Sequence, residues 1–107
     1  MSQYVIRLTH TSDQCPTANS KTREMMVKGA PELPQLAQKL GLKFLAGPLV
    51  LSAEHESIAV VEADKIETVH EFVLQSGLAQ MNSVRVSLAQ PIEEALKQME
   101  RMPPPLY

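Results

Sequence analysis

The chain has 107 residues, of which 44% are hydrophobic and 21% charged, an ordinary composition for one globular domain that forms its core without disulfides. Its formal net charge is −2 and its ten lysines and arginines are scattered, which argues against a nucleic-acid partner. The sequence holds no apolar run of the roughly 18 residues that a membrane span needs, and its single cysteine cannot form an internal disulfide, so we expect a cytoplasmic protein with no membrane partner.

The first third of the chain predicts a strand, a polar loop and a helix. Residues 4–9 alternate between apolar and other side chains, which is the pattern of a half-buried strand. Residues 10–18 contain threonine, serine, aspartate and proline, which favour a loop. Asn19 or Ser20 can then cap a helix whose apolar side is supplied by residues 25–27.

The middle of the chain predicts a second helical piece and a hairpin. Residues 34–40 carry leucine and alanine at helical spacing, and Gly41 is the expected C-terminal cap. A strand follows over residues 43–51, and the Gly-Pro pair inside it indicates a sheet edge or a bulge. Residues 52–57 then form the hairpin loop. The two flanking strands should therefore be antiparallel neighbours.

The last third predicts a buried strand, a helix, an alternating strand and a final helix. Residues 58–63 are apolar at nearly every position, as in a central strand buried on both faces. Asp64 can cap a helix over residues 65–76, and residues 83–89 alternate as a fourth strand. Pro91 can open a last amphipathic helix.

This order of elements is β-α-β-β-α-β with an extra C-terminal helix, which predicts a ferredoxin-like α+β fold. In that topology the sheet is antiparallel, the first and third strands are central, and both crossover helices cover one face. We expect residues 1–102 to form this single domain and residues 103–107 to form an extended proline-rich tail.

The other face of the predicted sheet is uncovered. Alternation places Arg7 and Arg85 on this face, on neighbouring strands and beside apolar residues. A half-apolar open face favours a partner, so we expect a homodimer of the dimeric α/β-barrel type, unless the C-terminal helix folds over the face. In the dimer the two arginines could line a cavity that binds an anionic small molecule, or they could pair with carboxylates.

Three residues with metal-binding side chains are predicted to meet at one rim of the sheet. His10 follows the first strand, Cys15 lies in the loop after it, and His55 lies in the hairpin after the parallel second strand. Imidazole and thiolate together suit zinc or copper, and a fourth position would remain for water, substrate or Asp13. The ordinary alternative is a polar strand end, a buried small side chain and a solvated loop residue.

Cys15 can also be interpreted as a reactive thiol. It precedes the first helix, where the helix dipole lowers a thiol pKa, and His10 could assist it. The thiol would then act as a nucleophile or redox sensor, although the chain has no second cysteine to resolve an oxidised form.

These motifs resemble those of a group of small, largely uncharacterised prokaryotic proteins with the dimeric α/β-barrel fold. The shared pattern is a strand ending in His-Thr, a Cys-Pro a few residues on, and a hairpin with Glu-His before an apolar strand that ends in Glu-Ala-Asp. Here the pattern occupies His10-Thr11, Cys15-Pro16, Glu54-His55 and residues 60–64. The resemblance spans most of residues 4–96 and implies the fold rather than an activity.

Three functions remain open at this point. The first is a homodimer that binds a transition metal through His10, Cys15 and His55. The second is a monooxygenase- or isomerase-like enzyme that acts on a small organic molecule in the dimer cavity. The third is a non-catalytic module that binds a protein through the open sheet and the proline-rich tail.

Overall fold

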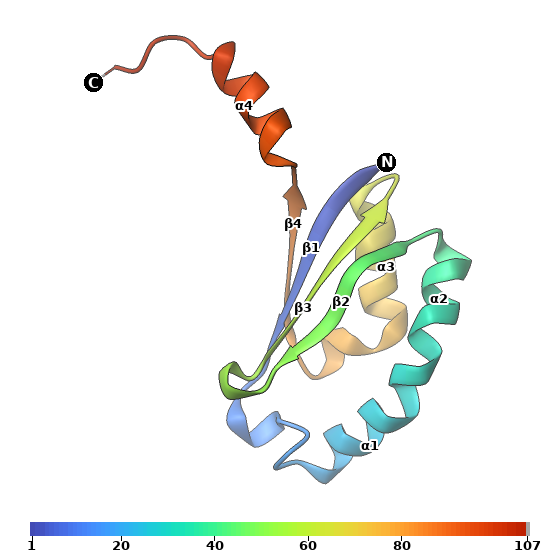
Figure 1. Ribbon diagram of the computed structural model, residues 1–107. Coiled ribbons are helices and arrows are strands. Elements are labelled where there is room, and N and C mark those ends of the chain that lie inside the picture. Colours follow the sequence, from blue (N-terminus) through green and yellow to red (C-terminus); the bar gives the residue numbers. More distant parts are fainter. Residues whose placement is uncertain (107) are drawn as a thin grey trace.

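The computed structural model describes residues 1–106, so Tyr107, the end of the predicted tail, lies outside the described residues. The fold is α+β, with a four-stranded antiparallel sheet and helices that cover one of its faces (Figure 1). Its helices and strands follow the predicted order: β1 (Ser2–Thr9), α1 (Ser20–Gly29), α2 (Leu33–Leu40), β2 (Lys43–Leu51), β3 (Glu56–Ala63), α3 (Ile66–Ser76), β4 (Ser83–Ala89) and α4 (Ile92–Glu100).

Local capping signals account for most helix ends. The Asn19 side chain accepts a hydrogen bond from the Thr22 N–H at 3.0 Å, which satisfies a free donor in the first turn of α1. Helices α2 and α3 end at Gly41 and Gly77, whose φ angles of 80° and 81° favour glycine. The prediction for Asp64 is wrong, because the N-cap position of α3 belongs to the next residue and has no side-chain cap.

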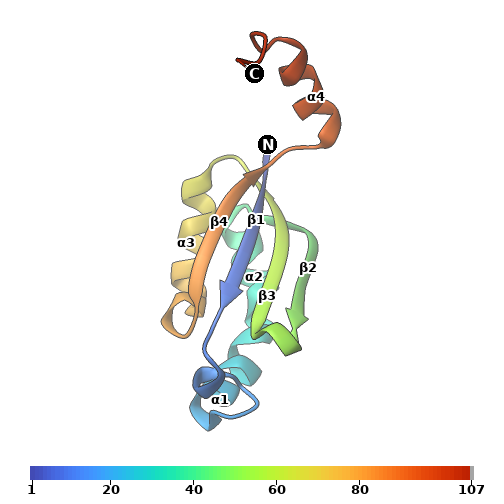
Figure 2. The ribbon, with the colours of Figure 1, turned by 90° about the vertical axis from the view of Figure 1, so that its left-hand side faces the viewer.

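The sheet order is β2-β3-β1-β4, which places β1 and β3 in the centre and β2 and β4 at the edges. This order and the antiparallel pairing are compatible with a ferredoxin-like arrangement. The pairing of β2 with β3 shifts register between Phe44 and Leu49, at the predicted irregularity in the edge strand. Both crossovers leave the helices on the same side of the sheet (Figure 2).

The core lies between this sheet and helices α2 and α3. Phe72, Val61 and Val69 are the largest side chains that are fully buried there. Strand β3 differs from its prediction in two ways, since it begins at Glu56 and is fully buried on one face only. Its residues on the other face are half-buried because no layer covers that side. Helix α1 also packs less than predicted, with Val27 71% exposed.

Helix α4 extends away from the sheet and leaves the open face uncovered (Figures 1 and 2). The radius of gyration of 16.5 Å reflects this extension, since a compact chain of about 100 residues has about 13 Å. Ile92, Leu96 and Met99 on α4 are each more than half exposed. The structure therefore shows no folding of this helix over the open face. Within residues 1–106, no helix has both the length and the apolar character to cross a membrane.

Candidate metal centre

The backbone ties the two predicted histidines together at one rim of the sheet. His10 directly follows β1, and its N–H donates a hydrogen bond to the carbonyl oxygen of His55 at 3.1 Å. His55 ends the short turn after β2 and has a left-handed backbone, with φ at 51°. A non-glycine residue with positive φ is uncommon, and such residues concentrate at functional sites. The turn thus places the His55 side chain beside the end of β1.

Cys15 is positioned by the loop between β1 and α1. Its carbonyl oxygen accepts hydrogen bonds from the N–H groups of Ala18 and Asn19 at 2.9 and 2.8 Å, which link this part of the loop to the helix cap. The Cys15 side chain is 7% exposed, and it is a free cysteine. The loop therefore presents a buried sulfur to the rim rather than to solvent.

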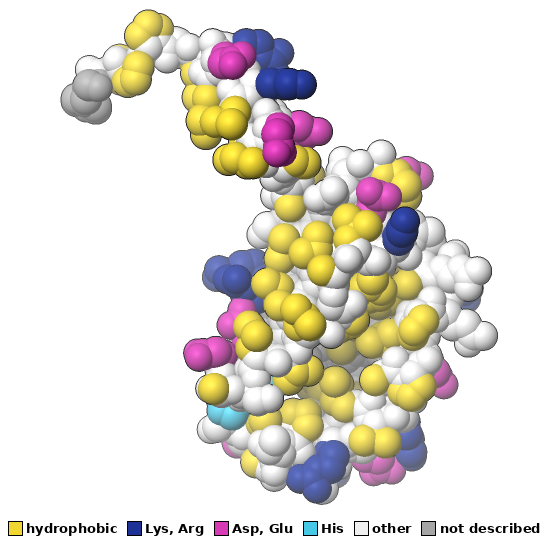
Figure 3. All heavy atoms as spheres, viewed as in Figure 1, with side chains coloured by type: hydrophobic (Ala, Val, Ile, Leu, Met, Phe, Trp, Pro, Cys, Tyr) yellow, Lys and Arg dark blue, Asp and Glu magenta, His cyan; other side chains and the backbone are white. Residues whose placement is uncertain are grey.

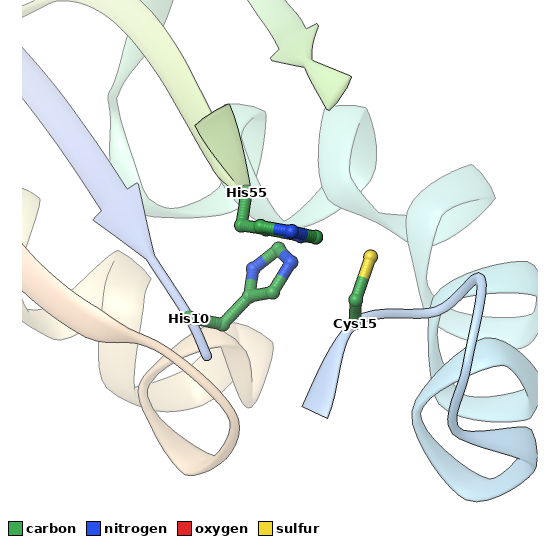
Figure 4. A group of neighbouring side chains, drawn as sticks. All are labelled: His10, Cys15 and His55. Carbon is green, nitrogen blue, oxygen red and sulfur yellow. The ribbon is translucent and has the colours of Figure 1, made fainter. Parts of the chain in front are cut away.

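The structure brings His10, Cys15 and His55 together, as the chain routing predicts. One ligand atom from each residue can be chosen so that all three atoms lie within 4.8 Å of one another. Figure 4 shows the three side chains pointing toward one another from separate segments of the chain. The two imidazole rings meet edge to face, with centroids 5.6 Å apart. Asp13, the suggested fourth ligand, is exposed and does not belong to this cluster.

Hydrogen bonding leaves imidazole nitrogens free at the centre of the cluster. His10 Nδ1 donates to Oδ1 of Asn82 at 3.1 Å, and the amide of Asn82 is held in turn by the Leu78 carbonyl at 3.0 Å. An amide oxygen only accepts, so Nδ1 of His10 is the donor in this contact, and a neutral ring then carries its lone pair on Nε2. Nε2 of His10 and Nδ1 of His55 are buried and have no hydrogen-bond partner within residues 1–106.

The pKa of the Cys15 thiol is lowered to about 6. The Thr17 hydroxyl donates to the Cys15 sulfur at 3.0 Å, and this bond is the main reason that the pKa of Cys15 falls from 9.0 to about 6. Smaller contributions come from the Thr17 backbone and from the imidazoles of His10 and His55, which lie near the sulfur without a geometric hydrogen bond to it, whereas burial opposes the change. The hydrogen bond from Thr17 is therefore the main stabilisation of the thiolate.

We expect Thr17→Val to raise the pKa of Cys15, because the substitution removes the largest stabilising hydrogen bond while keeping a similar shape. Iodoacetamide alkylation of the metal-free protein, followed against pH, measures this pKa. The rate should be half-maximal near pH 6 for the wild type and at a more alkaline pH for the variant. Thr68→Val, on α3, is the control and should leave the profile unchanged. Identical profiles for Thr17→Val and the wild type would contradict the assignment.

Sequence reasoning missed Thr17 and Asn82, the two residues that support the cluster. Asn82 could have been found from topology, because β4 pairs with β1 and Thr9 lies opposite Ser83. The residue before β4 must then lie beside the residue after β1, which is His10. Thr17 carries only a weak signal, a hydroxyl two residues after the cysteine.

The two arginines predicted to bind a ligand lie on the open face of the sheet, away from the His-Cys cluster. Arg7 and Arg85 are opposite each other on β1 and β4, and both line a surface depression of about 380 Å³ on the open side of the sheet. Arg7 pairs with a carboxylate of the same chain, that of Glu56, with Nε and Oε1 2.7 Å apart. Within residues 1–106 Arg85 has no carboxylate partner. The two arginines are thus neighbours, but they do not belong to the His-Cys cluster.

The chain matches no protein-family model, no curated protein and no solved structure. The resemblance to dimeric α/β-barrel proteins therefore stays a prediction.

Proposed function

We propose that this protein binds a transition metal ion, zinc or copper, through His10, Cys15 and His55. The observation that carries the proposal is the pair of buried imidazole nitrogens without hydrogen-bond partners beside a thiol whose pKa is about 6. A buried polar atom without a partner destabilises a fold by about 1–3 kcal/mol, so two at one point indicate a missing ligand. A metal ion would satisfy both nitrogens and the thiolate together.

The donor set suits these two metals. Zinc and copper both accept imidazole nitrogen and thiolate sulfur, and three protein ligands leave a coordination position for water or substrate. The contact between His10 and Asn82 supplies the outer hydrogen bond that orients a metal-binding histidine. We further propose that the chain acts as a homodimer, because the open sheet face and the apolar side of α4 are both exposed.

Metal stoichiometry tests the proposal. The chain should be purified without a histidine tag, stripped with a chelator under anaerobic conditions and titrated separately with Zn²⁺, Co²⁺ and Cu⁺. We expect one ion per chain, and for cobalt a near-ultraviolet absorption band that reports a bond to thiolate. Competition between the ions, measured with chromophoric chelators, identifies the preferred metal. A chain that takes up none of the three ions would refute the proposal.

A reactive thiol in an enzyme is the second candidate, favoured by the lowered pKa of Cys15. The two candidates differ in what they require of His55. A metal site loses a ligand in His55→Ala, so its affinity falls steeply. A thiol that reacts without metal keeps its main stabilising hydrogen bond, from Thr17, and should still be alkylated rapidly near pH 7 in this variant.

A further inference from the structure

A large apolar cavity lies between the sheet and the helices, beside the His-Cys cluster. Its volume is about 580 Å³, within the roughly 300–1,000 Å³ typical of small-molecule sites. It is lined by residues of β1, β2, β3 and all three packed helices, and among the lining residues only Ser57 has a polar side chain. Figure 3 shows a hollow bordered by hydrophobic side chains on this side of the molecule.

The cavity adjoins the site of the cluster. A smaller pocket of about 140 Å³ surrounds His10, Cys15 and His55. It shares five lining residues with the large cavity: Leu8, Met26, Val50, Ser57 and Leu78. The unpartnered imidazole nitrogens and the thiol therefore lie beside the end of the apolar cavity that these shared residues line. Other polar groups of the small pocket, such as Asn82, lie at the same end.

We propose that this cavity binds an elongated apolar molecule whose single oxygen-bearing head group reaches the His-Cys cluster. The charge of the head group follows from the proposed function, on which this part of the inference rests. Without metal, a neutral hydroxyl is preferred, because it can donate a hydrogen bond to an imidazole nitrogen without adding charge to a buried site. With a divalent ion, the site gains an open coordination position and a net positive charge, and a carboxylate is favoured.

Two observations favour a small molecule over a second protein chain as the occupant. The polar groups are confined to one end of the cavity, as for a ligand with one polar head. In addition, the cavity extends inward to core residues that are almost fully buried, Ile6 and Phe72. A second copy docking on the outside would contact exposed residues such as Val50, which is 67% exposed, rather than these.

Titration with a series of alkanols tests the cavity independently of any metal. Butanol, hexanol and octanol should bind the metal-free chain with affinity rising about fourfold for each added methylene, because each buries more apolar surface. The NMR signals of the His10 and His55 rings should shift when octanol binds, since the hydroxyl reaches them. A second titration, with octanoate, should show at least tenfold tighter binding to the zinc-loaded chain than to the metal-free chain.

A substitution that fills the cavity provides the decisive variant. Ala59 is 7% exposed and lines the cavity from β3, so Ala59→Leu should weaken octanol binding at least tenfold. Its melting temperature should stay equal or rise, because a larger apolar side chain fills empty space instead of overpacking a filled core. Val50→Asp, at an exposed lining position, is the second variant and should weaken binding without unfolding the chain. Ala79→Leu, exposed on the short turn after α3 and outside the cavity lining, is the matched control.

These experiments test binding in the cavity separately from the contact with a bound metal. Octanol binding that Ala59→Leu abolishes would support the cavity, whereas no effect of bound zinc on octanoate affinity would contradict the contact between the head group and the cluster. Affinity that does not depend on chain length, or that both variants leave unchanged, would overturn the inference. A chain that binds no alkanol but changes from dimer to monomer in Ala59→Leu would also overturn it, because a second copy would then occupy the cavity.

Discussion

Replacing Cys15 with serine is expected to lower the affinity for zinc by more than about 100-fold, since outer hydrogen-bond partners alone contribute about 10- to 100-fold and Cys15 would be a direct ligand. A serine hydroxyl does not ionise near neutral pH and is a poor donor for a borderline-soft ion. The variant should still fold, because the side chain keeps its size and lies outside the main hydrophobic core. Competition with a chromophoric chelator measures the affinity.

Two further variants calibrate this result. Asn82→Ala removes the hydrogen bond that orients His10 and should reduce the affinity about 10- to 100-fold, less than the loss of the ligand itself. His70→Ala removes an exposed histidine of α3 and should leave the affinity unchanged. If Cys15→Ser bound zinc as tightly as His70→Ala does, the sulfur could not be a ligand.

Phe72→Ala is expected to reduce the free energy of unfolding by about 3–5 kcal/mol. Phe72 is 1% exposed on α3 and packs edge to face against Phe44 of β2, with ring centroids 5.6 Å apart. Truncation removes apolar contacts between the helix layer and the edge strand and enlarges a space that already borders the ring. Since domains of this size have about 5–15 kcal/mol in total, the loss is a large fraction of the stability. Urea unfolding followed by circular dichroism measures it.

Leu74→Ala on the same helix is the matched control. Leu74 is 67% exposed, so its truncation should change the free energy of unfolding by no more than about 0.5 kcal/mol. Equal destabilisation by the two substitutions would show that α3 does not pack on the sheet through the face that carries Phe72.

The order of elements could be predicted because its signals are local. Asn19 begins α1 through side-chain capping, and Gly41 and Gly77 end α2 and α3 through backbone freedom, none of which depends on distant residues. The prediction for β3 was wrong because it concerned which faces of the sheet are covered by another layer. The apolar run in β3 suggested two buried faces, but whether a face is covered depends on where α4 lies, and the sequence of α4 does not determine its direction.

The meeting of His10, Cys15 and His55 could be predicted because topology alone carries distant segments to one rim. The hydrogen bonds that support these three residues are harder to predict from the sequence. The bond between His10 and Asn82 joins residues 72 positions apart and depends on side-chain placement of a few tenths of an ångström. The apolar cavity was not predicted either, because its size depends on the distance between α1 and the sheet. Sequence periodicity shows which side of a helix is apolar but not how closely that side approaches its neighbour.

The hydrogen bond between the backbones of His10 and His55 would affect the speed of metal exchange in the proposed site. Because that bond and the loop contacts of Cys15 form with the fold, the three donors are already in place before an ion arrives. Uptake of the proposed ion would then involve little ordering of the chain, unlike small zinc domains that fold only around their metal. Such a preformed site can load and release its ion without unfolding, which is the behaviour suited to a metal that must be exchanged rather than stored permanently.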